Sequence, residues 1–219
     1  MKEIGESKCP LCQNLVKTSF YSKGERKYFK CKNCDLIFLS PTQYLSANDE
    51  KSRYDLHQND PKDDAYRNFL GKMFNPMQAC IKEKSYGLDF GSGPNPTLSI
   101  MFEEAEHTME IFDIYYANNP MVFKSEEYDF ITLTEVIEHL HNPIEVLKKL
   151  WACLKPNGYL GIMTKFSTGI DDFPKWHYKN DDTHVCFFSE NTFKWIAEKL
   201  NARIDYIKND VVVYKKIDN

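Results

Sequence analysis

The stretch from Ser85 to Pro96, which reads SYGLDFGSGPNP, constrains the fold more than any other part of this sequence. A short apolar run ends in Asp89, and a Gly-Ser-Gly turn begins at Gly91. Glycine has no Cβ atom, so it lets the chain turn sharply and lets a ligand approach the backbone. We expect a strand over 86–90, a tight turn, and a helix over 98–104 whose first amides face that ligand.

A second apolar run, over 108–112, ends at Asp113, which lies 22 residues beyond Gly91. In a βαβ nucleotide site, an acid at about this distance accepts hydrogen bonds from ribose hydroxyls. The nicotinamide fingerprint also requires a third glycine, three residues after the second. That position is Pro96 here, which argues against a dinucleotide site.

Two later segments complete the pattern. Residues 128–139 read YDFITLTEVIEH, which predicts a strand over 130–134 that runs directly into Glu135. Residues 154–164 read LKPNGYLGIMT, which predicts a turn over 155–158 and a strand over 159–164. An amphipathic helix over 144–154 joins the two strands.

In this order, the motifs resemble those of class I S-adenosylmethionine-dependent methyltransferases. The resemblance spans residues 85–164 and implies a transferase with an α/β, Rossmann-like, mostly parallel sheet. It also implies a closing antiparallel hairpin, here at 204–207 and 211–214. Finally, it implies that S-adenosylmethionine is held by Asp89, Phe90, Gly91, Ser92, Gly93, Asp113, Ile114, Thr134 and Glu135.

The sequence departs from the family pattern after the second strand. Only 14 residues separate Asp113 from Tyr128, too few for a helix, a third strand and another helix. We therefore expect a sheet that is trimmed at this edge. The family's acid beside the adenine has no clear counterpart, and Ile114, Tyr115 or Tyr116 can pack there instead.

Four cysteines in two Cys-x-x-Cys pairs predict a small zinc ribbon over residues 1–40. A tetrathiolate of this spacing has no open coordination position, so the zinc should be structural. Disulfides and a redox pair are the alternatives, and the paired motifs disfavour the redox reading. The predicted ligands are Cys9, Cys12, Cys31 and Cys34.

Charge separates this ribbon from the rest of the chain. Residues 1–39 carry eight Lys and Arg against four Asp and Glu, whereas the whole chain has a net charge of −4. The basic ribbon can contact RNA or a partner protein, or it can simply cap the main domain, which we favour. No apolar run is long enough to cross a membrane, and no signal peptide is visible, so we expect a cytoplasmic protein.

The remaining chain divides into a linker over 41–65 and a methyltransferase domain over 66–219. In the linker, Tyr54 or His57 can belong to a lid over the cofactor, although a surface loop is the simpler reading. A helix is predicted from Tyr66 onward, and Pro76 should kink or split it. The long loop over 165–188 is rich in aromatic and acidic residues, which indicates a functional segment.

Glu135, Glu138 and His139 would share one face of a helix that begins near Glu135. Together with His184, they can ligate a divalent cation. This arrangement resembles two metal-dependent groups, the small-RNA 3′-terminal 2′-O-methyltransferases and the O-methyltransferases of ubiquinone biosynthesis. The resemblance implies Mg²⁺ or Mn²⁺ bound to the acceptor oxygens. In a metal-free alternative, His139 or His184 acts as general base. The catalytic candidates are therefore Glu138, His139 and His184.

The leading functional interpretation is O-methylation of a small molecule. The acidic main domain disfavours a nucleic-acid substrate, because phosphate contacts require clustered cations. Methylation of RNA held by the basic ribbon is the second interpretation. A non-catalytic module that binds the cofactor or a partner is the third, and the intact Asp89, Gly91, Gly93 and Asp113 argue against it.

Overall fold

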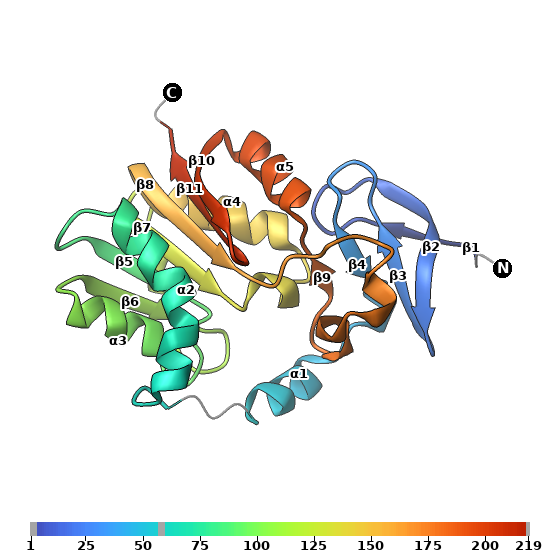
Figure 1. The fold of residues 1–219 in the computed structure, drawn as a ribbon, viewed down its shortest axis with the longest axis horizontal. Helices are drawn as coiled ribbons and strands as arrows, with labels where there is room; N and C mark the ends of the chain where they lie inside the picture. Colours follow the sequence, from blue (N-terminus) through green and yellow to red (C-terminus); the bar gives the residue numbers. More distant parts are fainter. Residues whose placement is uncertain (1–3, 57–59, 218–219) are drawn as a thin grey trace.

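The computed structural model describes residues 4–56 and 60–217. These residues form a large β-sheet flanked by helices and a smaller sheet beside it (Figure 1). The smaller sheet is built mainly from the N-terminal part of the chain, and the larger one from the C-terminal part.

The large sheet has six strands in the order β10-β11-β8-β7-β5-β6. Its β6, β5, β7 and β8 run parallel, whereas β11 is antiparallel to β8 and β10 is antiparallel to β11. The strands are β5 (Tyr86–Phe90), β6 (Thr108–Phe112), β7 (Tyr128–Thr134), β8 (Leu154–Met163), β10 (Ala202–Lys208) and β11 (Val211–Lys216). The predicted Rossmann-like sheet and its closing hairpin are therefore confirmed.

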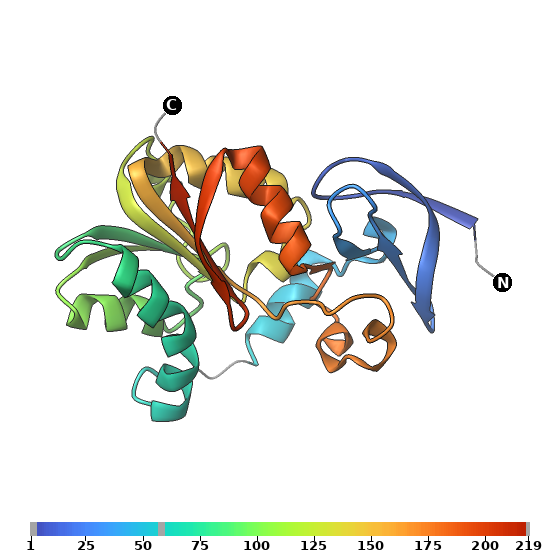
Figure 2. The ribbon, with the colours of Figure 1, turned by 45° about the horizontal axis from the view of Figure 1, so that its top comes forward.

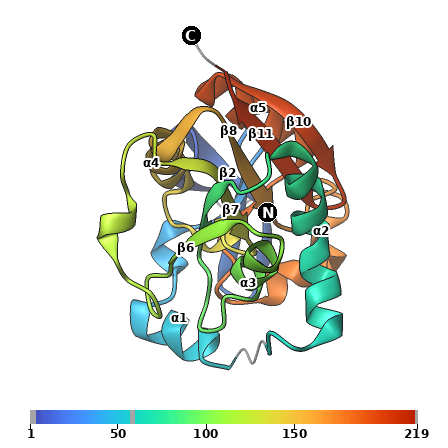
Figure 3. The ribbon, with the colours of Figure 1, turned by 90° about the vertical axis from the view of Figure 1, so that its left-hand side faces the viewer.

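Helices cover both faces of this sheet, with α2 and α4 on opposite sides in Figure 3. Side chains along β7 point alternately to the two faces of the sheet, and each face has its own hydrophobic core. Phe130 packs with α2 and α3 on one face, while Ile131 and Leu133 pack in the core that contains α4 and α5. The helices are α2 (Asp64–Cys80), α3 (Thr97–Glu104), α4 (Pro143–Cys153) and α5 (Glu190–Leu200). None of the helices in the described part of the chain combines the length and apolar character needed to cross a membrane.

The sheet ends at β6, as the short spacer after Asp113 predicts. Among the described residues, no strand pairs with the outer edge of β6. Residues 114–127 instead form a compact loop, closed by a bridge between Asp113 and Ala117 and by a short 3₁₀ helix, Pro120–Val122.

The smaller sheet has the order β1-β2-β3-β4-β9. Its first four strands are β1 (Ile4–Lys8), β2 (Leu15–Lys23), β3 (Arg26–Lys30) and β4 (Ile37–Leu39). The fifth, β9 (Cys186–Phe187), comes from the long loop after β8 and pairs antiparallel with β4. The N-terminal ribbon and this loop therefore share one sheet, and they lie side by side in Figures 1 and 2.

Three local expectations need correction. Pro76 lies inside α2 but does not split it, because loss of one amide donor leaves the neighbouring hydrogen bonds in place. The predicted turn over 155–158 belongs to β8, which is irregular there, with Asn157 at φ 63°. The linker is not a plain loop, since it forms α1 (Ala47–Tyr54), whose first turn is capped by Ser46.

Candidate functional site

The glycine turn after β5 is held in a shape that only glycine adopts easily. Gly91 has φ 81°, and a Cβ atom there would lie 2.3 Å from Val136 Cγ2. The amides of Gly91 and Ser92 both donate to the carbonyl oxygen of Phe112, at 2.7 and 3.2 Å. The turn is therefore fixed between the end of β6 and the segment that follows β7.

Asp89, which precedes this turn, is buried and points into the protein. Its carboxylate accepts hydrogen bonds from Thr132 Oγ1 at 2.8 Å and from Ser99 Oγ at 3.2 Å. Burial raises the pKa of Asp89 to about 6. The carboxylate joins β5 to β7 and to α3, so its position supports the turn from behind.

Asp113 organises the opposite side of the turn. One oxygen accepts from the amide of Gly93 at 3.0 Å, and the other accepts from the amides of Tyr115 and Tyr116 at 2.8 and 3.1 Å. Ile114 is 63% exposed. Phe90 stacks on Phe112, with ring centroids 5.2 Å apart.

Helix α1 covers this region from the linker. The hydroxyl of Tyr115 contacts Glu50, and that of Tyr116 donates to Asp55 at 2.6 Å. The ring of Tyr54 lies 5.7 Å from that of Tyr115 and 5.3 Å from that of His139. Helix α1 and the residue after it therefore contact Tyr115, Tyr116 and His139. The second lid candidate, His57, lies outside the described residues.

Glu135 departs from the predicted helical arrangement. It has φ 54°, and only Ile137–His139 form a short 3₁₀ helix, so Glu135, Glu138 and His139 do not share a helix face. Glu135 and Glu138 instead meet at Tyr178, whose hydroxyl lies 3.1 Å from Glu135 Oε2 and also contacts Glu138 Oε1. A phenol has one proton, so it can satisfy only one carboxylate at a time. Burial, followed by the charge of Glu138, raises the pKa of Glu135 to about 8.

Glu138, His139 and His184 form a compact cluster. One potential ligand atom from each lies within 4.8 Å of the other two. Glu135 is not part of this group. Glu138 is completely buried, and its Oε2 has no hydrogen-bond partner. A desolvated carboxylate oxygen of this kind costs free energy unless a cation or a proton meets it, so the cluster fits a bound cation.

Hydrogen bonds to the backbone set the tautomers of both histidines. His139 Nδ1 lies 3.2 Å from the carbonyl oxygen of Thr183, and His184 Nδ1 lies 2.8 Å from that of Tyr178. A carbonyl oxygen can only accept, so each Nδ1 carries the proton and each Nε2 keeps a lone pair. Burial also lowers the pKa of His184, which keeps its ring neutral. Metal-binding histidines are usually oriented in this way.

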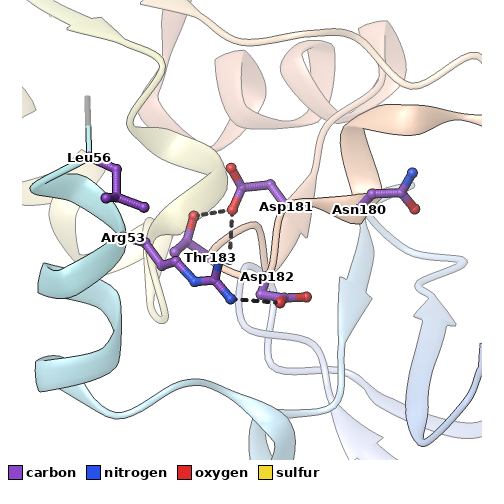
Figure 4. A pocket seen from close by; sticks show the side chains of 6 residues that line it. All are labelled: Arg53, Leu56, Asn180, Asp181, Asp182 and Thr183. Carbon is purple, nitrogen blue, oxygen red and sulfur yellow. Dashed lines mark hydrogen bonds and ion pairs between the residues drawn. The ribbon is translucent and has the colours of Figure 1, made fainter. Parts of the chain in front are cut away.

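A cavity of about 200 Å³ opens beside the cluster, between the end of α1 and the loop after β8 (Figure 4). Its lining residues are Arg53, Leu56, Asn180, Asp181, Asp182 and Thr183. Arg53 pairs with Asp182 at 3.5 Å across it, while Asp181 accepts from the Thr183 hydroxyl at 2.6 Å. Asp181 Oδ2 also lies 3.9 Å from His184 Nε2, so the cavity reaches the cluster.

The four cysteines of the ribbon converge as their spacing predicts. Their Sγ atoms all lie within 4.8 Å of one another, with Cys9 and Cys34 at 3.5 Å and Cys12 and Cys31 at 3.4 Å. Sulfur atoms of a tetrahedral zinc site lie about 3.8 Å apart. All four are free thiols, and three are buried. The set therefore fits a closed zinc site.

Sequence reasoning missed Tyr178 and the residues around the cavity. Tyr178 contacts both carboxylates, its ring centroid lies 4.2 Å from that of His184, and its carbonyl orients the same histidine. The only signal was the concentration of aromatic and acidic residues in the loop over 165–188. Such a signal marks a segment and does not distinguish one tyrosine from another.

Comparisons with known proteins agree with this architecture. A family model described as "Methyltransferase domain" matches residues 57–207. A search of curated proteins found no match. Among solved structures, the Burkholderia thailandensis 1,6-didemethyltoxoflavin-N1-methyltransferase, with bound 1,6-didemethyltoxoflavin and S-adenosylhomocysteine, aligns with a TM-score of 0.60 and 14% identity. The alignment covers 91% of this chain and 99% of that one.

Two further structures are similar over the larger part of the chain. A SAM-dependent methyltransferase from Aquifex aeolicus aligns with a TM-score of 0.51 and 18% identity, over 73% of this chain and 100% of that one. Another, from Archaeoglobus fulgidus, aligns with a TM-score of 0.50 and 16% identity, over 70% and 100%. At these identities the structures establish the fold, while the family model covers more than half of the sequence. The chain therefore belongs to the methyltransferase-domain family, and its fold is that of the class I S-adenosylmethionine-dependent enzymes.

Proposed function

We propose that this protein transfers the methyl group of S-adenosylmethionine to a hydroxyl oxygen of a small molecule, assisted by a divalent cation at Glu138, His139 and His184. The convergence of these three side chains beside the glycine turn carries the proposal. Val136, between Glu135 and Glu138, lies against Gly91, so the cluster and the turn belong to one site.

The cofactor would occupy the space around the glycine turn. A Cβ atom at Gly93 would meet nothing within 4 Å, so the backbone there is open to a ligand. Asp113 Oδ1 accepts from two backbone amides and Oδ2 from one, so Oδ2 keeps a lone pair for a ribose hydroxyl. Thr134 Oγ1, at the end of β7, is buried without a hydrogen-bond partner, which suits a polar group of a ligand. The remaining predicted contacts are Asp89, Phe90, Gly91, Ser92, Ile114 and Glu135, with Asp89 acting from behind the turn.

When bound, S-adenosylmethionine supplies a methyl group on a sulfonium, an already activated leaving group. The protein then has to place the acceptor in line and keep water away. Helix α1 and Tyr54 cover this region, and the cavity at Arg53 and Asp182 offers an approach for the acceptor. An acceptor without negative charge suits this cavity, because Arg53 is already paired with Asp182 and Asp181 adds a negative charge.

A divalent cation would be held by Glu138 and by the Nε2 atoms of His139 and His184. Two imidazoles and one carboxylate suit Mn²⁺ better than Mg²⁺, which prefers oxygen ligands. Such a cation lowers the pKa of a bound hydroxyl. Without it, the neutral His184 keeps an Nε2 lone pair that can accept the proton of the hydroxyl.

The ribbon supports this proposal as a structural zinc domain held by Cys9, Cys12, Cys31 and Cys34. Several of its cations have partners within the chain: Lys23 donates to Asn180, Arg26 pairs with Asp182, and Lys30 pairs with Asp35. These contacts leave fewer cations for RNA phosphates and favour a ribbon that caps the main domain.

The decisive experiment is calorimetric titration of S-adenosylhomocysteine and of Mn²⁺ into the protein and into Glu138→Gln. We expect cofactor binding in both proteins and Mn²⁺ binding in the parent alone. Small hydroxylated and amine acceptors are then screened by release of S-adenosylhomocysteine. Mn²⁺ binding that is equal in both proteins would refute the cation site. Transfer to amines alone would refute oxygen as the target, and transfer to RNA alone would replace the small-molecule reading.

A further inference from the structure

The loop that carries His184 is anchored on the N-terminal ribbon. Main-chain pairing joins Ile37 to Phe187 and Phe38 to Cys186, and the amide of Leu39 donates to the carbonyl oxygen of Val185 at 2.9 Å. Two side chains of the ribbon add hydrogen bonds to this loop. Lys23 of β2 donates to Asn180 at 2.7 Å, and Tyr28 of β3 donates to the carbonyl oxygen of Lys179 at 3.3 Å. The chain on both sides of His184 therefore makes several contacts with the ribbon.

Arg26, the first residue of β3, makes the contact nearest to His184. Its Nη1 forms an ion pair of 2.5 Å with Asp182, and its Nη2 donates to the carbonyl oxygen of His184 at 3.2 Å. The guanidinium lies over the ring of Tyr28, 5.7 Å from its centroid, and the side chain is only 20% exposed. Arg26 thus binds both the side chain of Asp182, two residues before His184, and the main-chain carbonyl of His184 itself.

The same side chain carries a cost that packing does not explain. Arg26 Nε is buried and has no hydrogen-bond partner. Leaving a buried donor unsatisfied costs free energy, and the cost is larger for a charged group. Features that cost stability are expected at functional sites.

We propose that Arg26 is a positioning residue for the transfer site, so that the zinc ribbon supports the geometry of that site. The proposal rests on the role assigned above to His184. Two of the contacts that hold His184 are the carbonyl oxygen of Tyr178, which binds Nδ1, and Arg26, which binds the main-chain carbonyl. Two different guanidinium nitrogens serve Asp182 and His184, and a lysine ammonium cannot reproduce that fork.

The ribbon connects this contact to its predicted metal. The strand that begins at Arg26 ends at Lys30, directly before Cys31. Release of zinc should therefore let His184 move from its position, as should the loss of the two contacts that Arg26 makes with Asp182 and with the His184 carbonyl. The glycine turn has its own supports in Phe112 and Val136, so cofactor binding should survive.

The test compares Arg26→Lys with Arg203→Lys as a matched control. Arg203 makes a two-point pair with Asp205, at 2.6 and 2.8 Å, on the exposed surface of β10. Asp182→Asn serves as a milder second variant that leaves the bond from Arg26 to the His184 carbonyl in place. Each protein is assayed for zinc content, S-adenosylhomocysteine affinity, Mn²⁺ affinity and the ring ¹⁵N chemical shifts of His184.

We expect Arg26→Lys to weaken Mn²⁺ binding about tenfold or more and to shift the His184 ring signals, with cofactor affinity and zinc content unchanged. Arg203→Lys should match the parent in every measurement. Unchanged Mn²⁺ affinity and unchanged ring signals in Arg26→Lys would overturn the proposal. If the parent binds no Mn²⁺, the cation role fails, and the His184 ring signals alone decide whether Arg26 positions that residue.

Discussion

Replacing Glu135 by glutamine should remove a pH-dependent loss of stability. Burial, followed by the charge of Glu138, raises the pKa of Glu135 from 4.5 to about 8 in the folded protein. Between these two values the folded chain holds a proton that the unfolded chain has lost. The free energy of unfolding of the parent should therefore fall as pH rises through this window and level off above about pH 8.

The size of the effect follows from the shift and from its surroundings. A rise of this extent corresponds to about 5 kcal/mol for an isolated group. Glu138 is coupled to Glu135 through Tyr178, so the proton is shared and part of the cost is already carried by its neighbour. We expect about 2–3 kcal/mol to depend on Glu135 itself.

The assay is urea unfolding of the parent and of Glu135→Gln at about pH 5 and about pH 9, in buffer free of Mg²⁺ and Mn²⁺. The two proteins should be similar in stability at the lower pH, since glutamine resembles the protonated acid and keeps a partner in Tyr178. At the higher pH the variant should be more stable by the amount above. Glu198→Gln, an exposed position on α5, is the control and should follow the parent. Parallel pH profiles for Glu135→Gln and the parent would refute the reasoning.

Three further predictions concern separate parts of the site. Gly91→Ala should cost about 2–4 kcal/mol and abolish cofactor binding, because of its φ of 81° and the contact with Val136, whereas Gly93→Ala should cost about 1 kcal/mol. Urea midpoints and S-adenosylhomocysteine titration check both, and equal costs would contradict the steric argument. Chelation should release zinc from Cys9, Cys12, Cys31 and Cys34 and unfold the ribbon, as read by a colorimetric zinc indicator and circular dichroism. If the chelator releases no zinc and the ribbon keeps its fold, the four thiols do not hold a structural zinc. Tyr178→Phe should destabilise the protein by about 1–3 kcal/mol, because it removes the hydroxyl shared by Glu135 and Glu138. Tyr159→Phe, whose ring lies under Lys215, is the matched control, and equal losses in the two variants would contradict a special role for Tyr178.

Local patterns predicted much of the main domain. The strand over 86–90, the glycine turn and the closing hairpin are each encoded by neighbouring residues, so they could be recognised without tertiary information. The short spacer after Asp113 likewise predicted the trimmed sheet edge. The convergence of the four cysteines followed from spacing alone, because two short knuckles leave few arrangements for a tetrahedral site.

The remaining features depend on contacts between distant residues. Strand β9 has only two residues, Cys186 and Phe187, which is too short for any periodic pattern, and its partner β4 lies about 150 residues earlier. The positive φ of Glu135 was hidden because Glu-x-x-Glu-His also fits a helix face. The roles of Tyr178 and Arg26 arise only when the loop after β8 packs on the ribbon.

The pairing of β4 with β9 has a consequence for how the protein is made. Ile37, Phe38 and Leu39 leave the ribosome about 150 residues before their partner strand, Cys186–Phe187. Until then β4 presents an apolar, unpaired edge of the kind that recruits strands from other chains. Early zinc binding would order the ribbon but would not protect this edge. The final assembly of the ribbon sheet therefore waits until Phe187 has been synthesised, and nascent molecules stalled before Phe187 should be the ones most prone to aggregate.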